Sequence, residues 1–176
     1  RGYDSAGMAV INDEGQIGAI KSKGRVMVLE NRIQQEGGLA GCVGIAHTRW
    51  ATHGEPNDVN AHPQSDDAAS GHGIQLVHNG IIENHGVLKT WLLDQGHVFT
   101  SETDTEVLAH LIGEFYDGDL EIAVQTALRE VTGAYAIAVI SSKEPEVLVA
   151  ARKGSPLMVG VGSGEHHAPR RLPEEH

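Results

Sequence analysis

Four short segments of the chain concentrate side chains that bind, orient or titrate: "RGYDSAG" (1–7), "HTRWATHG" (47–54), "HNGIIEN" (78–84) and "SETDTE" (101–106). Arg49 carries a planar fork of donors that suits a carboxylate, and Asp104 offers the opposite charge to an ammonium group. Asn79 and Gly80 offer a side-chain amide and an unencumbered backbone N–H, which together can stabilise a developing oxyanion. Such groups could bind charged parts of a small molecule and stabilise a negative charge that develops during a reaction.

Each of these residues also has a more ordinary interpretation. Arg49 and Asp104 are residue types that commonly form exposed ion pairs of little energetic value. Asn-Gly is a frequent hairpin turn, although the residues after Gly80, "IIENHGVLKTW", have helical rather than strand character. Trp50, the large ring beside Arg49, could be partly buried core.

Two expected strands end in two of these segments, "HTRWATHG" and "HNGIIEN". The stretches "CVGIAHTR" (42–49) and "GIQLVHNG" (73–80) each run from apolar into polar residues, so we expect a site at neighbouring strand ends. The stretches "AGMAVIND" (6–13) and "QIGAIKSKG" (16–24), separated by a turn, predict a β-hairpin.

Helical spacing of apolar residues predicts helices within 25–35, 81–96, 99–118 and 119–133. Gly96 and Gly133 are expected to end two of them, and Thr103 with Glu106 has the spacing of a capping box. Apolar strands buried on both faces are then expected at 134–142, 146–152 and 157–162. This order excludes a simple βαβ alternation and predicts an α+β layered fold.

Composition restricts the possible partners. The formal net charge of -11 leaves no basic stripe for a phosphate backbone, so we expect no nucleic-acid partner. The longest apolar runs, such as "AYAIAVI", are too short to cross a bilayer, so no membrane partner is expected either. The single cysteine, Cys42, excludes an internal disulfide and fits a reducing, cytoplasmic location.

Taken together and in this order, the four segments resemble the glutaminase domains of the glutamine–fructose-6-phosphate amidotransferase family (glucosamine-6-phosphate synthases). These are class II glutamine amidotransferases with the N-terminal-nucleophile hydrolase fold. The resemblance covers residues 1–164 and leaves 165–176 as an irregular tail outside the family pattern. It implies an α+β fold, an αββα sandwich, here truncated at both ends.

The resemblance also implies roles for single residues. The glutamine-binding positions would be Arg49, Thr52, His53, Gly80 and Asp104. Asn79 with Gly80 would form the oxyanion hole, and Arg1 would orient the nucleophile. Trp50 would be a gate that covers the site and controls a path for ammonia. L-glutamine is the implied substrate, and we expect no metal or organic cofactor.

In this family the nucleophile is a cysteine at the mature N-terminus, whose own α-amino group acts as general base. The chain opens in mid-motif at Arg1 and holds no such cysteine, so we expect it to be a piece of a longer polypeptide that hydrolyses no glutamine by itself. Cys42 is not expected to substitute, because burial in an apolar strand would make its thiol inert. Fructose 6-phosphate would be handled by a missing isomerase half, in a homo-oligomeric parent.

Two alternatives remain open at this stage. A non-catalytic glutamine-binding module would keep the amino-acid clamp and lack the nucleophile. A metal-dependent hydrolase would draw its ligands from His47, His53, His62 and His78. The chain contains no H-E-x-x-H, no H-x-H and no cysteine pair, so the metal hypothesis has little support. For His62 and His78 we expect structural hydrogen bonds instead.

Overall fold

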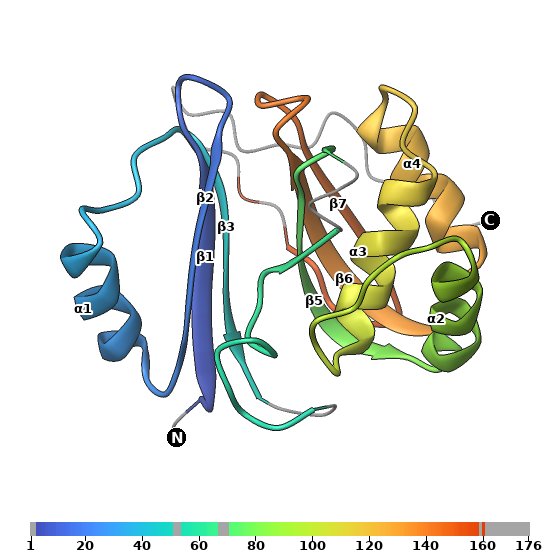
Figure 1. Cartoon of the computed structure of the whole chain (residues 1–176), viewed down its shortest axis with the longest axis horizontal. Coiled ribbons are helices and arrows are strands. Elements are labelled where there is room, and N and C mark those ends of the chain that lie inside the picture. Colours follow the sequence, from blue (N-terminus) through green and yellow to red (C-terminus); the bar gives the residue numbers. More distant parts are fainter. Residues whose placement is uncertain (1–2, 51–53, 67–70, 159, 161–176) are drawn as a thin grey trace.

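A computed structural model of the chain describes residues 3–50, 54–66, 71–158 and 160. Four layers are stacked in the order helix, sheet, sheet, helices (Figure 1). Helix α1 (Val26–Gln35) covers the outer face of one sheet. The outer face of the other sheet is covered by α2 (His85–Asp94), α3 (Asp104–Glu114) and α4 (Leu120–Arg129). The predicted αββα sandwich is confirmed.

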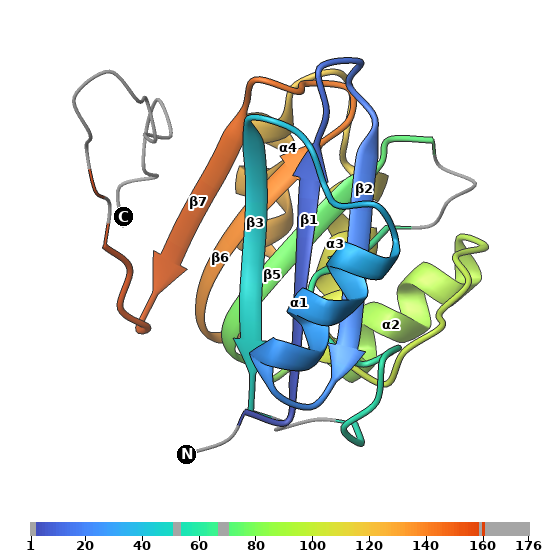
Figure 2. The same ribbon diagram turned by 90° about the vertical axis from the view of Figure 1, so that its left-hand side faces the viewer.

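The first sheet has three antiparallel strands in the order β2-β1-β3, namely β1 (Ser5–Ile11), β2 (Ile17–Lys23) and β3 (Val43–Arg49). Figure 2 looks onto this sheet, with α1 in front of it. The side-chain oxygen of Asn12 accepts the backbone N–H groups of Glu14 and Gln16, which closes the turn between β1 and β2. The predicted hairpin is therefore confirmed, together with the helix and the strand that follow it.

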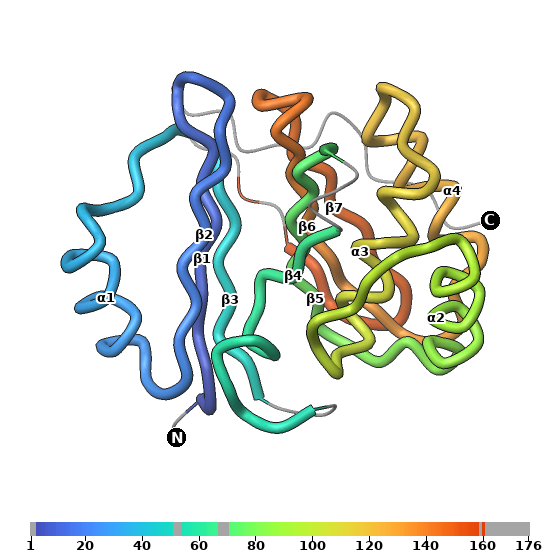
Figure 3. Tube along the Cα trace, viewed as in Figure 1, coloured from blue at the N-terminus to red at the C-terminus, as the bar shows by residue number. Residues whose placement is uncertain are grey.

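The second sheet has four antiparallel strands in the order β4-β5-β6-β7, namely β4 (Gln64–Ser65), β5 (Ile74–Ile82), β6 (Gly133–Ser141) and β7 (Leu148–Lys153). The two-residue strand β4 was not predicted, because so short a segment carries no periodicity. The segment 54–63 leads into β4 and passes from the first sheet to the second (Figure 3).

Three apolar clusters hold the layers together. Between the sheets lie Ala9, Ile11, Ile45, Val77 and Ile140. A smaller cluster of Ala6, Ile20 and Leu29 joins the first sheet to α1. The largest lies between the second sheet and its three helices. Strand β6 contributes to two clusters, with Ile137 facing the helices and Ile140 facing the other sheet. The expected burial of this strand on both faces is thus confirmed.

The predicted junction between strand and helix at residue 81 is wrong. Strand β5 continues to Ile82 and the helix begins at His85, because β6 is long enough to pair with the whole of β5. Asn79 is paired with Ala136, so Asn79 and Gly80 lie inside a sheet rather than in a turn.

Two smaller predictions also need correction. Gly133 does not end α4, which stops at Arg129; it is the first residue of β6. Of the strand expected at 157–162, residues 157, 158 and 160 are described and form no strand. The tail 165–176 lies outside the described residues.

Within the described ranges, no helix is both long and apolar enough to cross a bilayer.

Helix α2 offers a test of which face of the helix layer stabilises the fold. Leu92 is 0% exposed and Leu93 is 51% exposed, although they are neighbours in one helix. We expect Leu92→Ala to lower the free energy of unfolding by about 2–5 kcal/mol, because it leaves a cavity in the core. Leu93→Ala should cost less than about 1 kcal/mol.

Urea unfolding followed by circular dichroism measures both values. The slope of the transition should be the same for the two variants, since neither changes the surface exposed on unfolding by much. Equal losses in the two variants would contradict this assignment of the core.

Candidate active site

Arg49 ends β3 on the face that looks towards the second sheet. Side chains alternate along a strand, so Ile45, His47 and Arg49 share one face, and Ile45 belongs to the cluster between the sheets. Arg49 is 4% exposed. Burial lowers the pKa of its guanidinium, while the carboxylates of Asp4 and Asp104 act in the opposite direction. The ordinary surface ion pair considered for Arg49 is therefore excluded.

Asp104 is the first residue of α3 and is also 4% exposed. Its Oδ2 accepts the backbone N–H of Ile82, the last residue of β5, at 2.9 Å. The same oxygen lies 4.0 Å from Nδ1 of His78. The Ile82 N–H therefore holds the carboxylate at the N-terminus of α3, a position that favours negative charge.

The start of α3 is built around Glu106. Thr103 caps the helix by accepting the Glu106 N–H at 3.2 Å, which confirms half of the predicted capping box. The other half is wrong: the Glu106 carboxylate does not bond to Thr103. It accepts the backbone N–H and the hydroxyl groups of Thr100 and Ser101, at 2.7–2.8 Å. These hydrogen bonds fix the loop that leads into Asp104.

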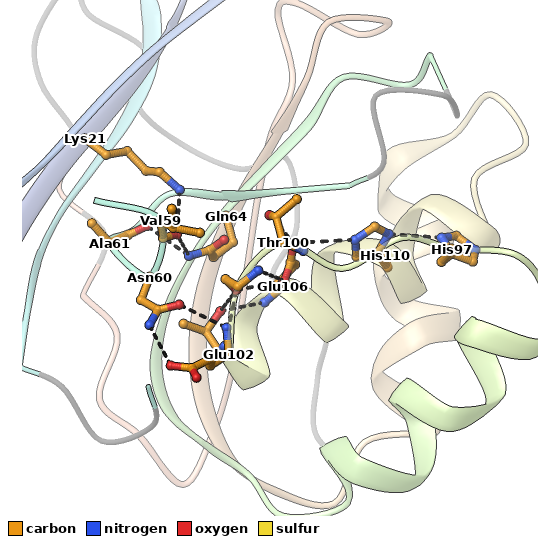
Figure 4. Close-up of polar contacts among 12 residues, drawn as sticks. Lys21, Val59, Asn60, Ala61, Gln64, His97, Thr100, Glu102, Glu106 and His110 are labelled. Atoms are coloured by element: carbon orange, nitrogen blue, oxygen red, sulfur yellow. Dashed lines mark hydrogen bonds and ion pairs between the residues drawn. The ribbon is translucent and has the colours of Figure 1, made fainter. Parts of the chain in front are cut away.

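Burial alone would raise the pKa of Glu106, but hydrogen bonds from His110, Thr100 and Ser101 outweigh it and hold the value at about 2. His110 in turn contacts His97, with 3.0 Å between the two Nδ1 atoms, and His97 bonds to Glu114 at 3.0 Å. Figure 4 shows the part of this chain of polar groups that runs along α3 from Glu106 to His97.

Gly80 lies in β5 with a φ of 141°, in the region that favours glycine. A Cβ at this position would overlap the carbonyl oxygen of Ala134 in β6. Asn79, just before it, accepts a hydrogen bond from Nε2 of His47 on its Oδ1 at 2.9 Å. Both Asn79 and Gly80 are exposed, so a small molecule can reach them.

The segment 54–63 is held to the start of α3 by Asn60. Its Nδ2 donates to Glu55 O at 3.0 Å. Figure 4 shows its bonds to Glu102: Nδ2 donates to Glu102 Oε2, and Oδ1 accepts the Glu102 N–H at 2.9 Å. Lys21 of β2 reaches the Val59 carbonyl at 3.1 Å, so the first sheet also contacts this segment. Burial lowers the pKa of Lys21, although Glu106 and Asp58 oppose the change.

The predicted site residues that the structure describes lie together. Arg49 and Asp104 interact electrostatically, and His47 links Asn79 to the strand that carries Arg49. Trp50 is 68% exposed, so the alternative of a core tryptophan is excluded. Arg1, Thr52 and His53 lie outside the described residues.

Two expectations about other residues are wrong. Cys42 is exposed rather than buried, and it precedes β3, whereas Arg49 ends it. A strand rises about 3.3 Å per residue, which puts the two residues about 20 Å apart. His78 makes the expected hydrogen bond, to Thr105 at 3.0 Å, but Nδ1 of His62 is buried without a hydrogen-bond partner among the described residues.

Sequence reasoning missed the supporting residues Asn60, Glu102 and Lys21. Glu102 lies in one of the four motifs, so its position was a signal, but its partner Asn60 is 42 residues away. Of the candidate metal ligands, His53 lies outside the described residues, and in the ranges that the structure describes no group of three His, Cys, Asp or Glu could hold a metal ion. An open pocket beside His97 and Glu114 lies at the far end of α3 and is separate from this site.

Residues 47–166 match the family described as the glutamine amidotransferase domain. The chain is 56% identical over 164 residues to the glutamine–fructose-6-phosphate aminotransferase (isomerizing) of Thermotoga maritima. It is 55% identical over 161 residues to the protein of the same name from Clostridium acetobutylicum. These alignments cover 93% and 92% of this chain, which spans 26% of the length of each relative.

Solved structures agree with this match. The fold is similar to that of the glutamine phosphoribosylpyrophosphate amidotransferase from B. subtilis complexed with ADP and GMP, with a TM-score of 0.68 and 29% identity. A structure described as the allosteric regulatory enzyme of purine biosynthesis gives a TM-score of 0.73 and 28% identity. Each comparison covers 86% of this chain and 31% of the other.

The pKa of Glu106 leads to a prediction about acid stability. Because this value is lowered from 4.5 to about 2 by folding, the ionised carboxylate stabilises the fold above pH 4.5, and this contribution is lost as the pH falls towards 2. Glu106→Gln should therefore reduce the free energy of unfolding at pH 7, by at most about 3 kcal/mol.

The deficit of Glu106→Gln relative to the unsubstituted chain should shrink between pH 4.5 and pH 2, as measured by urea unfolding at each pH. Glu30→Gln, at an exposed position of α1, is the matched control and should show no such trend. A deficit independent of pH would contradict the assigned role.

The position of Gly80 can be tested separately. Gly80→Ala combines a positive φ with an overlap with Ala134, so it should destabilise the fold by at least about 2 kcal/mol. Gly86→Ala is the control, since nothing lies within 4 Å of the added atom and alanine favours the helix. Thermal unfolding midpoints compare the two, and a tolerated Gly80→Ala would contradict the strand geometry.

Proposed function

The chain belongs to the glutamine amidotransferase domain family, and from this membership we propose that the described site binds L-glutamine and presents its side-chain amide for hydrolysis. The observation that carries the proposal is the buried pair of opposite charges, Arg49 and Asp104, at the ends of two elements from different layers. An α-amino acid carries one carboxylate and one ammonium group, so it can satisfy both.

In this proposal Arg49 binds the α-carboxylate through its planar fork of donors. Asp104 binds the α-ammonium with the carboxylate that Ile82 and the start of α3 hold in place. Thr52 and His53, close to Arg49 in the sequence, add donors to the carboxylate, as the family resemblance implies. These contacts would fix the amino-acid end and leave the side chain of the substrate free to extend.

Asn79 and Gly80 would bind the oxygen of the side-chain carbonyl. The Asn79 amide and the Gly80 N–H would stabilise the negative charge that develops when a nucleophile attacks, and the loss of one such donor typically costs ~10²–10³ in rate. Arg1 would orient the nucleophile. Trp50, which is exposed beside Arg49, would cover the bound substrate and control the exit of ammonia.

The relatives that match are named as glutamine–fructose-6-phosphate aminotransferases, and the chain spans about a quarter of their length. We therefore propose that the ammonia released here is transferred to fructose 6-phosphate, giving glucosamine 6-phosphate, by further residues outside this chain. A homo-oligomeric assembly and a cytoplasmic location remain predictions.

A second candidate function is glutamine binding without turnover by these 176 residues. It is favoured by the position of Cys42, the only thiol of the sequence, about 20 Å along β3 from Arg49. A coupled assay for released ammonia separates the two candidates. Any turnover should be unaffected by Cys42→Ser, because this thiol is too far from the clamp to attack a bound substrate.

Calorimetric titration of the whole chain with L-glutamine tests the clamp. Arg49→Lys and Asp104→Asn should each weaken binding by at least about tenfold. The lysine keeps the charge but loses the planar fork of donors that binds a carboxylate at two points, and the asparagine leaves the buried α-ammonium without a negative partner. The matched exposed controls Arg152→Lys and Asp94→Asn should leave the affinity unchanged.

Ligand analogues assign each contact to its group. Glutaramate lacks the α-ammonium, so Asp104→Asn should not weaken its binding further, whereas Arg49→Lys should. The analogue 4-aminobutanamide lacks the α-carboxylate, so the reverse is expected. No binding of L-glutamine, or equal effects of both variants on both analogues, would exclude the proposed clamp.

A further inference from the structure

A side-chain hydrogen bond joins the two sheets at the candidate site. It runs from Nε2 of His47, in β3 of the first sheet, to Oδ1 of Asn79, in β5 of the second sheet, at 2.9 Å. The proposed roles above use Asn79 but assign nothing to His47. The position of His47 is nevertheless fixed by the fold, and its partner is one of the proposed oxyanion donors.

The register of the strands explains why these two residues meet. Ile45 and Val77 pack in the cluster between the sheets. His47 and Asn79 lie two residues further along the same strands, and side chains two apart on a strand share a face. The hydrogen bond is therefore a second contact between the sheets, next to the apolar one and at the polar end of the sandwich.

The bond determines which end of the Asn79 amide is available. A primary amide accepts through Oδ1 and donates through Nδ2, so the two ends are not interchangeable. With Oδ1 occupied by His47, the amide nitrogen is left to donate. No other hydrogen bond of the Asn79 side chain occurs among the described residues, and the side chain is exposed. A rotated amide would instead present an oxygen, which would repel a developing oxyanion.

The tautomer of His47 follows from its surroundings. Nδ1 of His47 is buried without a hydrogen-bond partner among the described residues. A neutral ring with its hydrogen on Nδ1 would bury an unpaired donor and set two acceptors, Nε2 and Asn79 Oδ1, against each other at 2.9 Å. The tautomer with the hydrogen on Nε2 avoids both costs and donates to Asn79.

The ring of His47 is kept uncharged by its neighbours. Burial lowers its pKa, and nearby Arg49 lowers it further, against the opposing effect of the Asn79 bond. The ring of His62 lies 4.5 Å away, and burial lowers its pKa well below the usual value, so it adds no positive charge at neutral pH. Protonation of His47 would in any case keep the hydrogen on Nε2.

We propose that His47 is a positioning residue, which holds the Asn79 amide with its nitrogen directed at the side-chain carbonyl of the substrate. This inference rests on the proposed function, which assigns Asn79 to the oxyanion hole. The inference adds only how the Asn79 amide is oriented there. It predicts that the N–H donor of His47, and not its aromatic ring, is what orients the Asn79 amide.

The polarisation of bound glutamine tests this directly and requires no turnover. Glutamine labelled with ¹³C at its side-chain carbonyl is bound to the whole chain, and isotope-edited infrared difference spectra give the frequency of that carbonyl. Hydrogen bonds from an oxyanion hole lower the frequency relative to free glutamine, and Asn79→Ala should remove much of this shift.

His47→Leu removes the donor and should lose much of the same shift, while the affinity for glutamine falls by less than about tenfold because the clamp is intact. His47→Gln places a side-chain N–H₂ near the position of Nε2 and should restore most of the shift. The matched pair His72→Leu and His72→Gln, at a histidine that contacts Tyr116 instead, should behave like the unsubstituted chain.

The outcomes separate this inference from the function on which it rests. If glutamine does not bind, or if its carbonyl is not shifted, the proposed function fails. If Asn79→Ala removes the shift and His47→Leu keeps it, or if His47→Gln fails to restore it, the positioning role is wrong. Long-range ¹⁵N–¹H spectra of the unsubstituted chain give an independent result, because a hydrogen on Nδ1 of His47 would also overturn the proposal.

Discussion

The geometry of the site depends on the hydrogen bond between the Ile82 N–H and the Asp104 carboxylate. Ile82 ends β5 two residues after Gly80, and Asp104 begins α3, so this contact joins a strand end to a helix start across 22 residues of chain. It places a buried anion beside the strand that carries Asn79 and Gly80. The site is therefore set by the packing of α3 on the second sheet, which the largest apolar cluster stabilises.

The buried charges at this site are stabilised by neighbouring groups of opposite sign. An isolated charge in a protein interior is costly, and both Arg49 and Asp104 are 4% exposed. The helix start and the Ile82 N–H stabilise Asp104, while Asp4 and Asp104 stabilise Arg49. A zwitterion adds one charge of each sign, so it can bind without a change in the net charge of the site. A ligand with only one charge would disturb this balance.

Periodicity and turn chemistry were sufficient to predict the hairpin, the apolar stripes of the helices and the neighbouring polar ends of the two strands that carry His47 and Asn79. They failed where long-range pairing decides the outcome. Gly80 lies in a strand because β6 pairs with it, and no local signal in "HNGIIEN" reports that. The bonds of Asn60 to Glu102 and the strand β4 depend likewise on pairing between separate segments of the chain.

The alternation of side chains along β3 has a consequence for folding. Ile45, His47 and Arg49 face inward together, and Gly44, Ala46 and Thr48 face outward, so the apolar core and the polar site share one alignment. A slip of one residue against β1 would turn all three inward groups out and expose Ile45 to water. A chain misaligned in this way would lose the site and its apolar contact in the same step. The free energy that selects the native alignment therefore also disfavours compact conformers that lack the site.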